Sequence, residues 1–309
     1  MGVDLGGTKI QSIAMKARER VGEARSLTPR TSSDDVVAAV VDSIRSTGVP
    51  AAEIGAVGIG SPGEIDPRTG AVTQARNLAG FEGTVELAAL VSKAFEGVKV
   101  RVDNDVRSAL WGEYRLGAGR PYKNVLGVFV GTGVGGGLIV NGRLYEGRGA
   151  AGEIGHVVVK PGGRRCSCGR LGCLEAYAGR GQMELRARKL VKKGRKTVLF
   201  ELMKKRRRDR VTSGVIAEAL EMKDRLAEDL IKDAVAALGV GIASAQNLFD
   251  AEAVIIGGGL GDRLGAPFAE RVKAAMMPHL FSAQNAPALL NTELGDLAGA
   301  TGAALVAGA

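Results

Sequence analysis

Two stretches of this chain, far apart in the sequence, open in the same way, and that repeat constrains the fold more than any other feature. "VDLGGTKI" (3–10) and "VFVGTGVGGGLI" (128–139) each read as an apolar strand, a turn of glycine and threonine, and a second strand. They are not close copies, but the strands that follow each alternate with helices, which is typical of a mainly parallel sheet. We therefore expect an α/β protein of two similar lobes around a cleft, an N-terminal lobe over 1–117 and a C-terminal lobe over 118–309.

The length and composition fit such a two-lobed protein. With 309 residues the chain can bury a large core, and 46 glycines favour many tight turns. The N-terminus meets Asp4 before any apolar run, so it does not resemble a secretory signal. The most apolar stretch, 234–249, is too short to cross a bilayer and contains Ser, Gln and Asn, which favours a buried helix. We expect a cytoplasmic protein with no membrane partner.

The positive charge is concentrated in one segment. Residues 186–210 hold thirteen Lys and Arg against two acids, a local charge of +11, so a net charge of +9 leaves about −2 for the rest of the chain. Such a segment can bind nucleic acid or polyphosphate, but it is more often the solvated face of surface helices. The segment contains one aromatic residue, Phe200, and so offers little surface on which bases could stack. We therefore do not expect a nucleic-acid partner.

Three glycine-rich turns follow apolar strands and suit phosphate binding. In the first turn, backbone N–H groups of a tight glycine loop can surround phosphate oxygens, a hydroxyl and an ammonium can add contacts, and a strand-end carboxylate can hold Mg²⁺ through water. The residues concerned are Gly6, Gly7, Thr8, Lys9 and Asp4. The second turn offers Gly131, Thr132, Gly133 and Gly135, and the third offers Gly257, Gly258 and Gly259. One such turn is usually structural, whereas three suggest a nucleotide held from both lobes.

Acidic side chains lie where another apolar strand gives way to a helix. Asp103, Asn104 and Asp105 occupy this position, and carboxyl ends of parallel strands are where open sheets place their sites. Asp and Asn also cap helices regardless of function. Beside phosphate loops, Asp105 suits the carboxylate that orients an acceptor hydroxyl during phosphoryl transfer and takes its proton late. Asn104 would fix the neighbouring hydroxyl.

All three cysteines and one of the two histidines lie within a single loop, which we call the cysteine loop (153–175). Cys166, Cys168 and Cys173, with His156 ten residues upstream of the first, supply three sulfurs and one nitrogen, a set that suits tetrahedral Zn²⁺. Four protein ligands close the coordination sphere, so we expect a structural metal. Reduced cysteines without a metal are the alternative.

The metal-bound imidazole can also help to bind a polyol. If one nitrogen of His156 is on zinc, the other must carry hydrogen and becomes a donor of fixed direction. Glu153 and Glu175 lie at the two ends of the same loop and would supply acceptors. One donor and two acceptors can recognise adjacent hydroxyl groups.

Taken together, these motifs resemble the ROK family of sugar kinases and related repressors, within the actin-like ATPase (ribonuclease H-like) superfamily. "DLGGTK", "VDND", "GTGVGGG", "EIGH", "CSCGRLGCLE" and "IIGGG" stand in the family's order along the whole chain, and the histidine and cysteine motifs are highly specific. The resemblance implies that Asp105 is the catalytic base and that zinc is held by the histidine and cysteines named above. It also implies that the sugar contacts Asn104, Asp105, Glu153, His156 and Glu175, with loops at Gly63 and Asn77 closing over it.

The resemblance implies an enzyme closest to bacterial ATP-dependent glucokinases. We expect ATP, Mg²⁺ and structural Zn²⁺ as cofactors, glucose 6-phosphate as product, and a homodimer or homotetramer. The alternatives are an N-acetylmannosamine or N-acetylglucosamine kinase, a polyphosphate-using glucokinase, and a sugar-responsive repressor lacking its DNA-binding region. The repressor is disfavoured because the phosphate loops and Asp105 are present and no helix-turn-helix segment precedes the first turn. The sequence leaves open the sugar, the preferred phosphoryl donor and the role of residues 186–210.

Overall fold

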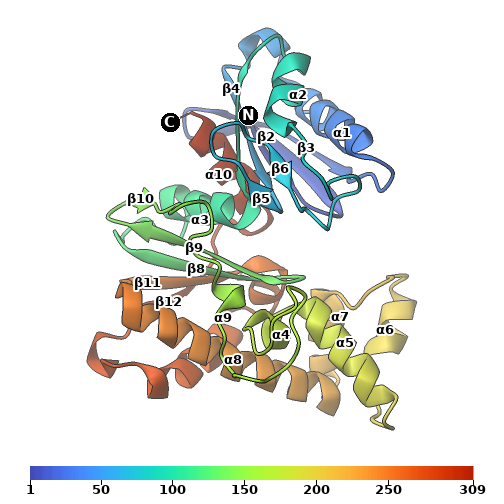
Figure 1. Ribbon diagram of the computed structural model, residues 1–309, viewed down its shortest axis with the longest axis vertical. Coiled ribbons are helices and arrows are strands. Elements are labelled where there is room, and N and C mark those ends of the chain that lie inside the picture. Colours follow the sequence, from blue (N-terminus) through green and yellow to red (C-terminus); the bar gives the residue numbers. More distant parts are fainter. Residues whose placement is uncertain (309) are drawn as a thin grey trace. The chain divides into compact units, whose positions relative to one another are not determined.

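The computed structural model describes residues 1–308 and divides into two compact units. The first unit comprises Met1–Pro121, Leu144–Ala151 and Glu293–Ala309, and the second comprises Tyr122–Arg143 and Gly152–Thr292. Each unit is built on its own five-stranded sheet (Figure 1). Each also has a separate apolar core.

The sheet of the first unit has the order β3-β2-β1-β4-β7. Its strands are β1 (Gly2–Leu5), β2 (Lys9–Lys16), β3 (Glu19–Leu27), β4 (Ala56–Ser61) and β7 (Lys99–Asn104). The first three strands form an antiparallel meander, whereas β1, β4 and β7 run parallel. The carboxyl ends of the three parallel strands therefore lie at one edge of the sheet.

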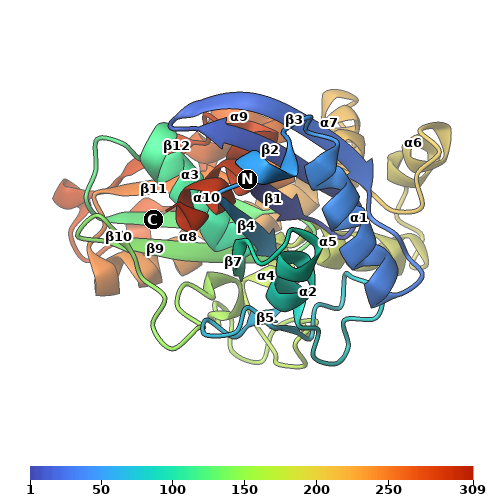
Figure 2. The same cartoon turned by 90° about the horizontal axis from the view of Figure 1, so that it is seen from above.

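Alternation of side chains along β1 and β4 gives this sheet two different faces. Val3 and Leu5 belong to the apolar core that also contains the buried face of α1 (Ser33–Arg45). Gly2 and Gly58 face α10 (Ala298–Ala307), whose backbone lies so close that a Cβ on either glycine would overlap it. Figure 2 shows α1 and α10 on either side of the strands. The face next to α10 also carries Asp4, since Asp4 lies two residues beyond Gly2.

The last helix of the chain belongs to the first unit. The sequence pattern assigned all of 118–309 to the second lobe, whereas α10 packs against β1, β4 and α3 (Asp105–Leu116). The reason is the small residues on the contact surfaces: Gly302 and Gly112 allow α10 and α3 to approach at backbone distance. Such long-range complementarity between glycines is not visible in a local sequence pattern.

The sheet of the second unit has the order β10-β9-β8-β11-β12. Its strands are β8 (Val125–Val130), β9 (Val134–Val140), β10 (Arg143–Leu144), β11 (Ala253–Gly257) and β12 (Ala288–Asn291). β8 pairs antiparallel with β9 and parallel with β11, which in turn is parallel to β12. Helix α9 (Gly258–Met276) packs against β8, β11 and β12, and α8 (Arg225–Phe249) packs against α9.

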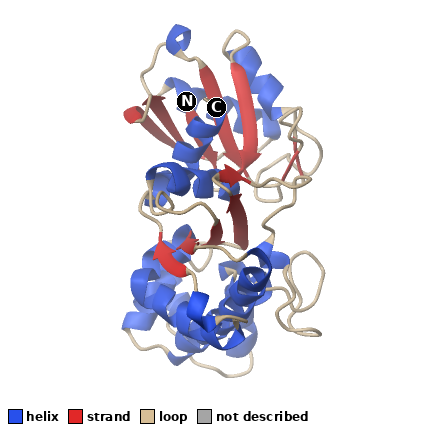
Figure 3. Ribbon diagram, turned by 90° about the vertical axis from the view of Figure 1, so that its left-hand side faces the viewer, coloured by secondary structure: helices blue, strands red, loops and turns tan. Residues whose placement is uncertain are grey.

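Helices make up most of the second unit outside its sheet (Figure 3). They include α4 (Glu175–Ala178), α5 (Arg180–Val191), α6 (Leu199–Lys205) and α7 (Ser213–Glu221). The remaining elements are α2 (Leu87–Ala94), the short strands β5 (Glu64–Ile65) and β6 (Val72–Thr73), and the 3₁₀ turns Ala51–Glu53, Ile154–His156, Met277–His279, Ala283–Asn285 and Gly295–Leu297. Among residues 1–308, no helix combines the length and apolarity that a membrane span requires.

The strand β3 was not expected from the sequence. β3 lies at the edge of the first sheet, and its sequence, "ERVGEARSL", has four charged residues, all of them exposed, while the small residues Gly22, Ala24 and Ser26 on the other side of the strand are half-buried. An edge strand of this kind has no apolar alternation to reveal it, because charged residues protect free sheet edges. The pairing with β2 holds it in place.

Candidate functional site

The parallel strands of the first unit bring acidic side chains to one edge of the sheet. In the register, Asp4 of β1 and Asp103 of β7 both pair with Gly60 of β4, so the three residues form a row across the sheet. A Cβ at Gly60 would lie 3.3 Å from the Cα of Asp105, which shows how closely the start of α3 approaches this row. The strand register, together with the lack of a side chain at Gly60, therefore brings Asp4 and Asp105 near each other.

The pKa of Asp4 is affected by its burial and by the nearby carboxylate of Asp105. Burial, and then the negative charge of Asp105, raise the pKa of Asp4 to about 7, and the opposing effect of Lys9 is smaller. Asp4 can thus gain or lose a proton near neutral pH. A cation bound here would stabilise the ionised form, which fits a residue that helps to hold Mg²⁺.

The three polar residues between β7 and α3 have different surroundings. Asp103 is buried, and its Oδ1 accepts hydrogen bonds from Arg107 at 2.8 Å (Nε) and 2.5 Å (Nη2). Asn104 is the N-cap of α3, because its Oδ1 accepts from the backbone N–H groups of Val106 and Arg107 at 3.0 and 3.2 Å. Asp105 is the first residue of the helix. Asn104 therefore caps the helix, and only its amide nitrogen is left for a ligand.

The first glycine turn is organised by its own backbone and by Asn77. The Gly6 N–H donates to the Lys9 carbonyl at 3.0 Å, which closes the turn. A Cβ on Gly7 would lie 2.7 Å from the carbonyl oxygen of Asn77, so only glycine lets the two loops meet. Asn77 itself is exposed. Lys9, expected to contact phosphate, forms an ion pair with Asp296 at 2.8 Å.

The loop that carries Gly63 packs against the same region. Gly63 has a φ of +97°, and a Cβ there would lie 2.6 Å from the carbonyl oxygen of Thr73. The short strands β5 and β6 pair Glu64 with Thr73 and hold the loop in place. The loops at Gly63 and Asn77, which the family resemblance predicts to close over the sugar, thus pack together with the first glycine turn in the first unit.

The second glycine turn lies in the other unit and is held by Glu175. The Val134 N–H donates to Oε2 of Glu175 at 3.1 Å, and a Cβ on Gly133 would lie 2.3 Å from the same oxygen. The other oxygen of Glu175 accepts from the Ser167 hydroxyl at 2.6 Å. Glu175 therefore connects the second glycine turn to the cysteine loop, a role that its position in the sequence did not suggest.

The third glycine turn leads from β11 into α9. Gly257 ends the strand and Gly258 begins the helix with a φ of +78°. A Cβ on Gly259 would lie 3.4 Å from the hydroxyl of Ser213 and 4.0 Å from Nη1 of Arg180. Arg180 also donates to the Thr132 hydroxyl at 2.9 Å, so the second and third turns share a neighbour that sequence reasoning missed.

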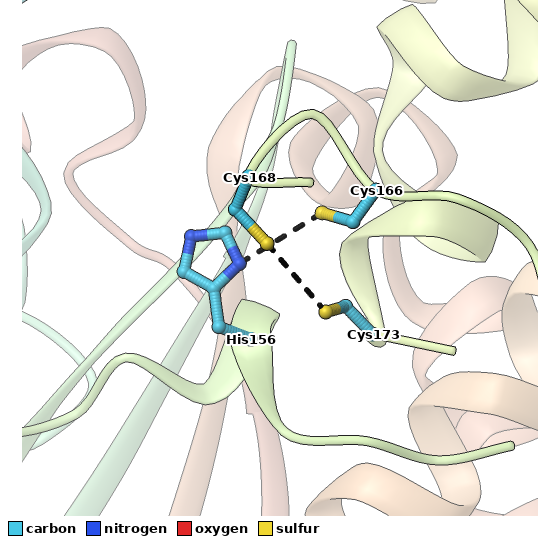
Figure 4. Close-up of side chains that lie close together, drawn as sticks. All are labelled: His156, Cys166, Cys168 and Cys173. Atoms are coloured by element: carbon cyan, nitrogen blue, oxygen red, sulfur yellow. Dashed lines mark hydrogen bonds between the residues drawn. The ribbon is translucent and has the colours of Figure 1, made fainter. Parts of the chain in front are cut away.

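The four expected metal ligands converge on one point (Figure 4). One ligand atom from each of His156, Cys166, Cys168 and Cys173 lies within 4.8 Å of all the others. The Cys168 and Cys173 sulfurs are 3.8 Å apart, and Nδ1 of His156 is 3.8 Å from the Cys166 sulfur. The two separations of 3.8 Å match the edge of a tetrahedron with metal–ligand bonds of about 2.3 Å. They are too long for a disulfide, whose sulfurs are about 2.05 Å apart.

The ligand set fits zinc in chemistry as well as in distance. Three thiols and an imidazole are soft and borderline donors, and no carboxylate belongs to the group. Burial raises the pKa of Cys166 to about 12. Partial burial also opposes ionisation of Cys168, but hydrogen bonds from the Arg170 N–H and the neighbouring thiols outweigh it and lower the pKa of Cys168 to about 7. A bound cation would favour the thiolate at all three positions.

The orientation of His156 determines what the ring can offer to a ligand. Nδ1 faces the sulfurs, while the second ring nitrogen lies on the opposite side of the imidazole (Figure 4). His156 ends a 3₁₀ turn, and Glu153, the N-cap of that turn, is exposed and its side chain makes no cap hydrogen bond. The cysteine loop thus presents a ring nitrogen and a carboxylate three residues apart.

Comparison with known proteins identifies the family. The model of the ROK family matches residues 1–309. This chain belongs to the ROK family. Structures of ROK sugar kinases have the actin-like ATPase fold, and the close match to them confirms the fold class expected from the sequence.

Three ROK relatives show the range of functions in the family. The glucokinase of Streptomyces coelicolor is 31% identical over 98% of this chain and 96% of its own length. A ROK family glucokinase from Streptomyces griseus, solved in complex with glucose and AMPPNP, is 32% identical, with a TM-score of 0.82 over 99% of this chain and 98% of that one. A ROK family transcriptional regulator, a homologue of the E. coli MLC protein, also reaches a TM-score of 0.82, at 25% identity over 99% of this chain and 76% of that one. Membership of the ROK family therefore fixes the fold but leaves the activity to be argued from the site.

Proposed function

We propose that this ROK protein transfers the γ-phosphoryl group of ATP to glucose, giving glucose 6-phosphate and ADP. The similarity to glucokinases over nearly the full chain supports the substrates. The transcriptional regulator shares the fold, so the fold alone does not indicate a kinase. The proposal therefore depends on the residues that phosphoryl transfer requires.

Asp105 carries the proposal. A phosphoryl acceptor needs a carboxylate that orients its hydroxyl and takes the proton late in the reaction. Asp105 begins α3 beside Asp4, and the capped N-terminus of the helix fixes its backbone. The buried pair between Asp103 and Arg107 anchors the same helical turn. A regulator that only binds sugar has no need of a base held in this way.

The glycine turns supply the proposed nucleotide contacts. The first turn (Gly6–Lys9) would bind phosphate oxygens from the first unit, and the second and third turns (131–135 and 257–259) would bind the nucleotide from the second unit. Asp4 is the residue in the first unit that would help to hold Mg²⁺, which neutralises phosphate charge when it is bound. The raised pKa of Asp4 means that this contact also depends on pH.

The cysteine loop supplies the proposed sugar contacts. With Nδ1 of His156 directed at the thiols, the other ring nitrogen carries the proton and donates to a hydroxyl, while Glu153 accepts from another. Asn104, through its amide nitrogen, and the loops at Gly63 and Asn77 complete the set. Zinc held by the histidine and the three cysteines would crosslink the loop and keep the ring orientation fixed. Glu175 joins the loop to the second glycine turn, and we propose that it also contacts the sugar.

A coupled assay of ADP release over a panel of hexoses tests this function. We expect glucose to give the highest kcat/KM, ahead of mannose, N-acetylglucosamine and N-acetylmannosamine. A higher kcat/KM for either N-acetylated sugar would replace glucose in the proposal with that sugar. Absence of ADP release with every sugar, together with binding of one of them, would instead support the regulator.

A further inference from the structure

Arg180 lies between the second and third glycine turns of the second unit. It is the first residue of α5, and its backbone N–H donates to the Gly131 carbonyl at 3.1 Å. Its Nη2 donates to the Thr132 hydroxyl at 2.9 Å and its Nη1 donates to the Ser213 hydroxyl at 3.0 Å. Gly259 is close enough that a Cβ there would lie 4.0 Å from Nη1. One guanidinium is therefore adjacent to both turns.

The guanidinium is fixed but its charge is not balanced by an acid. Within residues 1–308, arginines such as Arg164, Arg195 and Arg206 have carboxylate partners, whereas Arg180 forms no ion pair. The closest acid electrostatically, Glu184, already accepts hydrogen bonds from Arg188 and from the Val211 N–H. A guanidinium has five N–H donors, and two neutral hydroxyls use only two of them. Three donors are left for a ligand.

The burial of Arg180 and the positive charge near it also favour an anionic ligand. Partial burial, followed by the positive charge of Arg210, lowers the pKa of Arg180. A half-buried cation with another cation nearby is unfavourable unless a negative group is bound. Arg210 is also the last residue of the basic segment 186–210, so this segment extends to the glycine turns.

We propose that Arg180 is a phosphate-binding residue, whose guanidinium contacts an oxyanion of the nucleotide phosphate chain while Thr132 and Ser213 hold it in place. The proposal rests on the nucleotide site proposed above and adds to it a contact that no glycine turn can provide. Arginine suits this task because its planar fork can bind a phosphate with two parallel N–H groups and remain anchored by others.

Binding of a series of ligands tests the role without requiring sugar turnover. We would measure the affinities of ADP, AMP and adenosine for wild type, Arg180→Gln and Arg180→Lys by competition with a fluorescent nucleotide. Loss of charge-assisted hydrogen bonds predicts that Arg180→Gln weakens ADP binding by about tenfold to a hundredfold. Adenosine binding should be unchanged, because adenosine has no phosphate. Arg180→Lys should recover part of the ADP affinity, since it keeps the charge but loses the fork.

Lys189→Gln is the matched control, because Lys189 lies exposed on the same helix and its loss removes the same unit of charge. It should leave ADP affinity unchanged. Equal losses for ADP and adenosine in Arg180→Gln and Arg180→Lys would overturn the proposal and show that Arg180 only maintains the fold of the turns. A loss of ADP affinity in Lys189→Gln as large as in Arg180→Gln would also overturn it, because general charge would then explain the effect.

The same data separate this proposal from the proposed function. If wild type binds ADP and Arg180→Gln loses that binding, Arg180 keeps its role even if no hexose is phosphorylated. If wild type phosphorylates glucose and Arg180→Gln binds ADP normally, the kinase function stands and the role of Arg180 falls. If the wild type binds no adenine nucleotide, both the proposed role of Arg180 and the proposed ATP-dependent kinase function are wrong.

Discussion

Asp105 and Asp4 are the residues on which the proposed chemistry depends, and they come from separate parts of the sequence. Asp4 ends a strand and Asp105 begins a helix, and the row formed by Asp4, Gly60 and Asp103 brings them together. Burial, and then the negative charge of Asp105, raise the pKa of Asp4, so the carboxylate of Asp105 lies close enough to affect that of Asp4.

Replacement of Asp105 by Asn should strongly reduce turnover while leaving sugar binding intact. The amide keeps the size of the side chain but cannot take the proton, and loss of a general base lowers kcat by about 10²–10⁴-fold. Steady-state kinetics and calorimetric titration with glucose would measure the two properties on the same protein. A loss of glucose affinity as large as the loss of kcat would remove Asp105 from the role of base.

Replacement of Asp4 by Asn should stabilise the fold at high pH only. The folded-state pKa is raised from 3.8 to about 7, so the unfolded chain ionises first and the wild type loses stability as pH rises between these values. Asn does not titrate. Urea unfolding should therefore show little difference between Asp4→Asn and wild type near pH 4 and a clear gain for the variant near pH 8. An equal difference at both pH values would contradict the raised pKa.

Some site residues could be identified from the sequence and some could not. The convergence of His156 with the three cysteines was predictable, because spacing and residue type define a metal site. The capping role of Asn104 was one of two readings that the sequence allowed. The bridging role of Glu175 and the position of Arg180 depend on how α4 and α5 pack beside the second glycine turn, which no local pattern encodes.

At the level of elements, the cysteine loop and the glycine turns supply the proposed ligand contacts, and strands of the two sheets precede the glycine turns. Strands with continuous apolar runs, such as β8 and β11, were clear in the sequence because both of their faces are buried. The exposed edge strand β3 and the assignment of α10 to the first unit were not, since one lacks apolar alternation and the other depends on contacts between distant glycines.

Removal of one ligand from the cysteine loop should affect metal and sugar together. Cys166→Ser replaces a buried sulfur with a poor zinc ligand, and we expect the metal content to fall and the KM for glucose to rise because His156 is no longer held. Elemental analysis and kinetics would measure these two quantities.

Arg165→Gln is a suitable control for that experiment, because the neighbouring Arg165 is exposed and its side chain donates to the Gly169 carbonyl of the same loop. It should keep both the metal and the glucose KM of the wild type. A normal KM for glucose in metal-free Cys166→Ser would refute the link between the metal and the sugar.

At the level of the whole molecule, the uneven charge distribution has a physical consequence. The segment 186–210 runs from the second half of α5 past the end of α6, and two of its arginines, Arg195 and Arg206, are paired with acids on α8 and α7. Lys204, Lys205, Arg207 and Arg208 are exposed. We expect this surface to be solvated, with ATP as the phosphoryl donor.

Salt dependence distinguishes ATP from polyphosphate as the donor. A protein that contacts six to ten phosphates along a polyanion loses about 10³–10⁵-fold in affinity between about 50 and 200 mM salt. We predict a far smaller change in the KM for ATP, and no change in that KM when the four exposed cations are replaced by Gln. Efficient turnover with polyphosphate, lost in the fourfold variant, would show instead that the basic segment binds the donor.

The most direct test of the proposed function is to follow ³¹P NMR spectra of the protein mixed with ATP, Mg²⁺ and glucose. We predict that a phosphate monoester signal of glucose 6-phosphate and the signals of ADP grow in equal amounts, and that both grow at least about a hundredfold more slowly when Asp105→Asn replaces the wild type. Conversion of ATP to inorganic phosphate at a rate independent of glucose, or unchanged spectra in the presence of bound glucose, would contradict a sugar kinase.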